Sequence, residues 1–163
     1  MAGSKSKTPA QQTKTPKKGR IRAIKKEVDG IVFDSTMEAN YYIYLKEEKR
    51  KGNVLDFELQ PEFPLLDSYK KYGRTIRGIK YISDFLVTYA DGSQKVIDVK
   101  GRETDDFKLK RKIFDYKYPD LTLQLITWVE KTKQWVDYDE LKKTRSRIKR
   151  EKTKAKKNNS KVL

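Results

Sequence analysis

Residues 83–101 read SDFLVTYADGSQKVIDVKG, and this stretch decides the fold. Two runs rich in β-branched and aromatic residues flank the turn-forming segment 90–92, which predicts two antiparallel strands joined by a tight loop. A two-residue turn would place Asp84 opposite Val99, whereas a three-residue loop with a glycine in the left-handed region places it opposite Asp98. If the two acids act together, the connection is a three-residue loop or carries an equivalent bulge, with Asp84 and Asp98 side by side on neighbouring strands.

The rest of the chain supplies helices and further strands around this pair. Ser35 and Glu38 have the spacing of a capping box, so a helix is expected to begin there. Hydrophobic periodicity and turn signals predict, in chain order, a hairpin at 27–33, a helix to about 51, a strand at 54–66, a polar connection at 67–73, a β-rich stretch at 76–89, a helix at 104–118, a buried strand at 121–129 and a last helix that starts near 136–139 and dissolves into the C-terminal tail. This order predicts an α/β fold with a mixed central sheet.

The segment 54–66 carries two further expectations. Its first half alternates, so Leu55, Phe57 and Leu59 should share one face of a strand. Pro61 and Pro64 indicate that this strand lies near a sheet edge or bends, because proline cannot donate to a central ladder.

Neither cysteine nor histidine occurs among the 163 residues. Their absence excludes a disulfide framework, a thiolate zinc site and triads that depend on a histidine base. Any catalysis must therefore use carboxylates, lysine, tyrosine or a metal held by oxygen ligands.

The net charge of +16 is concentrated at the two ends of the chain. Residues 1–26 hold nine Lys or Arg and no acid, and residues 141–163 hold eleven and one acid. The segment 27–140 has 19 basic and 22 acidic residues, a net charge of −3. We expect a disordered basic arm at 1–26, a folded α/β domain at 27–140, and a basic helix end and tail at 141–163.

Basic arms of this kind suit a polyanionic partner, because each cation that neutralises a phosphate releases counterions. The alternative is that the arms are solvated segments that keep the protein soluble. No run approaches the roughly 20 apolar residues of a membrane span, and no apolar segment follows the basic N-terminus, so a cytoplasmic protein is expected.

Two acids and a lysine on adjacent strands suggest a hydrolytic site. Asp98 and Lys100 share one strand face, because side chains two residues apart point the same way. Hydrolysis of a phosphodiester needs an activated water and a place for negative charge, and carboxylates that hold Mg²⁺ beside a lysine supply both. The candidate catalytic residues are therefore Asp84, Asp98 and Lys100.

The pattern of Asp84, thirteen further residues and then DVK at 98–100 resembles the PD-(D/E)XK nuclease superfamily, with Ser83 where proline is usual. The predicted order of elements also resembles the restriction-endonuclease-like αβββαβ core of that superfamily. The resemblance implies that a glutamate on the first core helix completes the catalytic set and the metal site with Asp84 and Asp98. Glu38 holds that place.

More narrowly, the segments VDGIVFDS at 28–35, ELQPEF at 58–63 and DVKG at 98–101 resemble small nuclease-like proteins of phages and prophages. This resemblance covers roughly residues 27–128. It implies a homodimeric endodeoxyribonuclease that uses Mg²⁺, with Mn²⁺ as a substitute, in the cytoplasm of a bacterial host. Branched DNA, such as the Holliday junctions of phage DNA recombination, is the expected substrate.

The nucleic-acid contacts are expected on basic residues in three places. These residues are Lys17, Lys18, Arg20 and Arg22 in the N-terminal arm, Lys108 and Arg111 on the second predicted helix, and Arg145 and Arg147 near the C-terminus. On the helix, an ordinary solvated face is an equal alternative. Tyr81 or Tyr89 could stack on an unpaired base.

Other functions remain open from the sequence. A non-catalytic nucleic-acid-binding protein would use the basic arms equally well, but it has no reason to place two acids where phosphate should lie. A ribonuclease-H-like enzyme would also be acidic and magnesium-dependent, but the order of elements argues against it.

The individual site residues also have simpler interpretations. Asp98 and Lys100 could form a surface ion pair of little energetic value. Glu38 is explained by helix capping alone, and Glu58 is its rival for the metal site. Gln60 and Glu58 either line the site or face solvent.

Overall fold

The computed structural model describes residues 24–99 and 103–159, which form an α/β structure around a mixed five-stranded sheet. The strand order is β11 (Gln134–Asp137), β10 (Thr122–Val129), β9 (Gln94–Val99), β8 (Phe85–Tyr89) and β3 (Val54–Leu59). β9 and β10 are parallel, and the other neighbours are antiparallel. The parallel pair is possible because helix α2 (Asp105–Lys117) forms the crossover between its two strands.

The two faces of the sheet are covered by different helices. Helix α1 (Thr36–Arg50) and the hairpin of β1 (Lys26–Val28) and β2 (Ile31–Phe33) pack on one face, where Ile97 and Val99 of β9 enter the core. Helix α2 packs on the other face, against Val96 of the same strand and Leu125 of β10. Neighbouring residues of β9 thus enter two separate hydrophobic cores, which makes this strand the centre of the fold.

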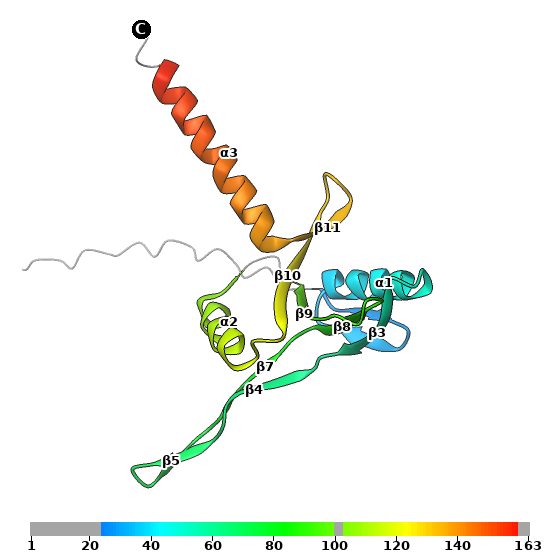
Figure 1. Cartoon of the computed structure of the whole chain (residues 1–163), viewed down its shortest axis with the longest axis vertical. Coiled ribbons are helices and arrows are strands. Elements are labelled where there is room, and N and C mark those ends of the chain that lie inside the picture. The colour runs from blue at the N-terminus through cyan, green and yellow to red at the C-terminus, as the bar shows by residue number, and fades with distance from the viewer. Residues whose placement is uncertain (1–23, 100–102, 160–163) are drawn as a thin grey trace, which may run out of the picture.

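A long two-stranded extension leaves the sheet beyond β3 and β8 (Figure 1). It is built from β4 (Glu62–Leu66) paired with β7 (Ile79–Ile82), and from β5 (Tyr69–Lys71) paired with β6 (Arg74–Ile76). We call residues 62–82 the β-arm. Its base packs on α2 through Phe63, Leu65 and Tyr81, whereas its far end extends away from the sheet (Figure 1).

The last helix, α3 (Tyr138–Asn159), extends away from the sheet in a different direction (Figure 1). The first turn of α3 is joined to α2 by an ion pair, in which Nη1 of Arg111 lies 2.7 Å from Oδ2 of Asp139. Within the described ranges, 24–99 and 103–159, no helix is both long enough and apolar enough to cross a membrane.

Most of the local predictions are confirmed. The loop at 90–92 has three residues, and the backbone N–H of Tyr89 donates to the carbonyl of Ser93 at 2.9 Å. The helix predicted at 104–118 is α2, and the strand predicted at 121–129 is β10, a buried strand of the sheet. The turn of the first hairpin, Asp29–Gly30, has positive φ at both residues, as its sequence predicts.

Four expectations about the fold are wrong. The connection predicted at 67–73 is part of the β-arm, and the strand β11 was not expected at all. The last helix does not dissolve near the start of the basic tail but continues to Asn159. Leu55 does not share a face with Phe57 and Leu59, because the register of β3 shifts between Val54 and Asp56 and leaves Leu55 55% exposed.

Phe114 joins α2 to the base of the β-arm, and we predict that its loss destabilises the fold. Its ring is fully buried, with centroids at 5.1 Å from Phe63, 5.9 Å from Tyr81 and 5.0 Å from Tyr118. Phe114→Ala should lower the free energy of unfolding by about 3–5 kcal/mol in urea titrations. Tyr116→Ala on the same helix, where the ring is 89% exposed, should cost less than about 0.5 kcal/mol. Equal losses in the two variants would show that α2 does not pack through Phe114.

Candidate functional site

Asp84 lies where the pairing of β8 with β9 becomes irregular. Phe85 is in register with Ile97, and the backbone N–H of Asp84 also donates to the Ile97 carbonyl at 3.1 Å. Two residues therefore oppose one, which is the arrangement of a β-bulge. The bulge turns the Asp84 side chain to the side of Phe85, towards α1. It also allows Oδ2 of Asp84 to accept a hydrogen bond of 2.6 Å from the backbone N–H of Val99.

Glu38 reaches the same region from the first turn of α1. Ser35 caps the helix by accepting from the backbone N–H of Glu38 at 3.1 Å, and its hydroxyl donates to Oε1 of Glu38 at 2.7 Å. The predicted capping box is therefore present in part. Capping and a role in the site are compatible, because the bond from Ser35 holds the Glu38 side chain at the helix N-terminus, where it lines a pocket.

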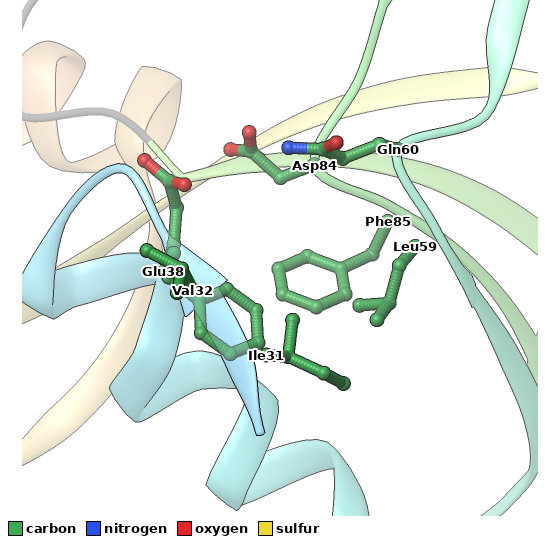
Figure 2. Close-up of a pocket in the computed structure, with 8 residues that line it drawn as sticks. Ile31, Val32, Glu38, Leu59, Gln60, Asp84 and Phe85 are labelled. Carbon is green, nitrogen blue, oxygen red and sulfur yellow. The ribbon is translucent and has the colours of Figure 1, made fainter. Parts of the chain in front are cut away.

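A pocket of about 160 Å³ brings Glu38 and Asp84 together with Gln60. Figure 2 shows the polar ends of these three side chains along one side of the pocket, with apolar side chains on the other. The apolar lining consists of Ile31, Val32, Phe33, Leu59 and Phe85. The volume is below the roughly 300–1,000 Å³ typical of pockets for organic ligands, and it suits a hydrated ion better.

Gln60 enters the pocket because the chain turns sharply after β3. Its φ is 49°, and its backbone N–H donates to the Asp84 carbonyl at 3.0 Å. Glu58, two residues earlier, is exposed and does not line this pocket. Of the two rival glutamates, the structure therefore brings Glu38, and not Glu58, to Asp84.

Asp98 lies on the other face of the sheet. Its side chain is 1% exposed and accepts a hydrogen bond from the Tyr81 hydroxyl. Burial, followed by the charge of Asp98 and this hydrogen bond, raises the pKa of Tyr81 well above its usual range. The charge of Asp84 makes a smaller contribution in the same direction.

The predicted catalytic set is thus only partly assembled. Asp84 and Glu38 share the pocket, whereas the Asp98 carboxylate is not among the groups that line it. The expectation that Asp84 sits directly opposite Asp98 is wrong, because the bulge interrupts the ladder at that point. A surface ion pair is also wrong for Asp98, which is buried. Lys100 lies outside the described residues.

The predicted nucleic-acid contacts fall into three groups. Lys17, Lys18, Arg20 and Arg22 lie outside the described residues. Arg145 and Arg147 are exposed on α3, and Lys108 is exposed on α2 with Nζ at 2.8 Å from Asp105. Arg111 is partly buried, and its ion pair with Asp139 joins two helices, which gives it a structural role.

Sequence reasoning missed the role of Tyr81. The expectation that its ring stacks on a base is wrong, because the ring is buried against Phe107 and Phe114. The alternation of Ile79, Lys80 and Tyr81 is a sequence signal that the ring shares the inward face with Ile79. Nothing in the sequence indicates that the hydroxyl meets Asp98, since β7 and β9 are not paired strands.

We predict that Tyr81→Phe destabilises the protein in a pH-dependent way. Removing the hydroxyl takes a donor from a buried carboxylate, which should cost about 1–3 kcal/mol in urea unfolding at pH 7. The folded-state pKa of Tyr81 is raised, so its contribution is fully present below the unfolded-state pKa of about 10 and is lost as the pH rises above it.

The difference between wild type and variant should therefore shrink above about pH 10, by up to about 1.4 kcal/mol per pH unit. Burial also raises the pKa of Tyr41, but Tyr41 is present in both proteins, so its effect on stability cancels in the difference between them. Tyr116→Phe is the matched control and should behave like wild type at every pH. A difference that stays constant from pH 7 to pH 11 would contradict the buried hydroxyl.

Comparisons with known proteins place the chain in a family without assigning a function to it. No curated protein matches this sequence. The model of DUF1064, a family described as proteins of unknown function, matches residues 18–137. The match spans well over half of the chain and includes the whole five-stranded sheet and the pocket. This chain is therefore a member of the DUF1064 family.

Proposed function

We propose that this chain is a divalent-metal-dependent DNA endonuclease with a restriction-endonuclease-like core. The observation that carries the proposal is the pocket in which Glu38 of α1 and Asp84, directly before β8, point to the same side (Figure 2). The order of α1, β3, β8, β9, α2 and β10 supports it, because this is the helix, three strands, helix and strand of the PD-(D/E)XK pattern.

The donor atoms of the pocket fit a hard divalent cation. Two carboxylates and an amide provide oxygen ligands only, which is the set that Mg²⁺ and Mn²⁺ accept. Across the ranges 24–99 and 103–159, no group of three acidic residues is arranged to hold a metal. Mg²⁺ is compatible with that, because it is commonly held by one or two carboxylates and keeps several waters. A bound divalent ion would supply an activated water and offset the charge of the phosphate.

The residues of this chain would have separate tasks. Asp84 is fixed by the Val99 N–H at one end of its carboxylate, and Glu38 is fixed by Ser35, so both are oriented before any ligand arrives. Asp98 lies outside the pocket lining and accepts a hydrogen bond from the Tyr81 hydroxyl. Lys100 comes next in the sequence after β9, and it would orient the attacking water.

A purely binding function fits the pocket less well. Two carboxylates in one small pocket repel each other and repel phosphate unless a cation or a proton intervenes. Sites that contact phosphate without a metal use Arg, Lys and backbone N–H groups instead. The chain has these cations elsewhere, on α3 and at its ends, where they would hold DNA while the acidic pocket acts on it.

The substrate and assembly are the finer part of the proposal. We infer that branched DNA, including the four-way junction, is cut by a homodimer that presents two sites to two strands. The resemblance of the segments 28–35, 58–63 and 98–101 to small nuclease-like proteins of phages and prophages supports this choice.

The proposal predicts metal-dependent cleavage that depends on the pocket acids. The full chain should cut a labelled four-way junction with Mg²⁺ or Mn²⁺ and not with EDTA. Linear duplex and single strand serve as comparison substrates. Asp84→Asn and Glu38→Gln should each lower the cleavage rate at least about 100-fold, because each removes a carboxylate charge that would hold the divalent ion. Lys100→Ala should have a comparable effect.

Glu58→Gln is the matched control, because it removes the same charge from an exposed side chain nearby. It should cleave at the wild-type rate. Binding of DNA without cleavage under either metal, unchanged by the pocket variants, would make this a binding protein and overturn the proposal.

A further inference from the structure

The far end of the β-arm is a surface that the proposed active site does not use. We call residues 66–78 the tip segment. Every residue of the tip segment is exposed, and β5 and β6 pair only with each other in the described structure. A two-stranded hairpin without a packed face is marginally stable in water. The tip segment therefore gains little from the rest of the fold, and burial does not explain its sequence.

The charge of the tip segment is opposite to that of the surrounding domain. It has four basic residues and one acidic residue, a net charge of +3, within a segment 27–140 whose net charge is −3. Lys71 and Arg74 are direct cross-strand partners. Like charges placed opposite each other on two strands destabilise the pairing. This arrangement costs stability unless a polyanion lies over it.

The turn at the tip carries a second unfavourable choice. Tyr72 and Gly73 both have positive φ, 50° and 70°, as in a type I′ turn. Asn or Asp is preferred at the first of these positions, whereas a bulky residue there is strained. The Tyr72 side chain is 91% exposed, and its one described contact is the Lys71 ammonium at 5.3 Å from the ring centre. An aromatic ring is thus held in solvent at the end of the arm, where it could meet a ligand.

The base of the arm is joined to the candidate site. The Gln60 N–H bonds to the Asp84 carbonyl at 3.0 Å, and the Ser83 N–H bonds to the Pro61 carbonyl at 3.2 Å. From residue 84 back to residue 73, an extended chain spans at most about 36 Å at about 3.3 Å per residue. One helical turn of duplex DNA is about 34–36 Å long. DNA that lies across the pocket can therefore reach the tip.

We propose that the tip segment is a DNA-contacting element, which binds phosphates through its basic side chains and stacks Tyr72 on an unpaired base. The basic side chains are Lys70, Lys71, Arg74 and Arg77. The choice of DNA as the polyanion rests on the proposed function. Stacking on an exposed base favours branched or single-stranded DNA over a closed duplex, because only the former offer free base faces.

The test measures binding by fluorescence anisotropy in EDTA, so that its outcome does not depend on cleavage. The probes are a labelled four-way junction, a linear duplex and a single strand. In the full chain, Lys71→Ala combined with Arg74→Ala should weaken binding to all three. The slope of log affinity against log salt for the duplex should fall by about 1.8, which is about 0.9 for each phosphate contact. Lys117→Ala with Lys131→Ala, both exposed and outside the arm, removes the same charge and should leave this slope unchanged.

Tyr72→Asn separates stacking from folding. Asparagine suits the type I′ turn, so the melting temperature should not fall. Duplex binding should stay at the wild-type level, whereas affinity for the junction and the single strand should drop at least about 5-fold. Unchanged affinity for these two DNAs would show that Tyr72 does not stack.

If the Lys71 and Arg74 variant binds every DNA as the control does, the inference is wrong. A chain that binds DNA through the arm but does not cleave would refute the proposed function and uphold this inference.

Discussion

The structure depends on the irregular backbone at the point where β8 begins, where two departures from regular strand geometry lie side by side. The backbone N–H of Asp84 bonds to Ile97 alongside the Phe85 pair, and across the next strand Gln60 turns with a positive φ. These two irregularities act at one place. They rotate Asp84 and Gln60 towards α1, where Glu38 lies, and they allow the β-arm to leave the sheet. With regular pairing, alternation would turn Asp84 to the other face and away from Glu38.

The acidic residues around β9 are divided between the two faces of the sheet. Glu38 and Asp84 lie on the α1 side, and Asp98 lies on the α2 side with Tyr81. Burying a carboxylate is costly unless hydrogen bonds and charges compensate it. A fold that needed only stability would place an apolar residue at the buried position of Asp98, as it does at Val96, Ile97 and Val99. The acids are therefore better explained by chemistry than by packing, and this reasoning leads to the endonuclease proposal.

Local sequence signals predicted most of the secondary structure. The loop at 90–92, the Ser35 cap and the second helix depend on residues close in the chain, and all are present. The bulge at Asp84 and the bond from Tyr81 to Asp98 depend on contacts between distant elements, so pattern reasoning missed them. The shift in the register of β3 at Leu55 also depends on pairing with another strand, and the alternation of residues along one strand cannot reveal an inserted residue.

The β-arm shows a different limit of sequence reasoning. Its tip is polar and contains glycine, and such a composition is typical of loops, so residues 67–73 suggested a simple connection. The strands there form because the turn geometry and the pairing of β4 with β7 extend one hairpin outwards. By contrast, the spacing of Asp84 and Asp98 on either side of the 90–92 loop singled out these two candidate acids, and the family resemblance added Glu38. Their division between the two faces could not be found from the sequence.

The central claim is that Asp84 and Glu38 together hold a divalent cation. The most direct measurement is electron paramagnetic resonance of Mn²⁺ titrated with the full chain, which reports the ion that remains free and requires no substrate. Wild type and Glu58→Gln should each remove one Mn²⁺ per chain from solution, whereas Asp84→Asn and Glu38→Gln should leave it free. Wild-type protein that leaves all the Mn²⁺ free, or binding that survives both pocket substitutions, would contradict the claim.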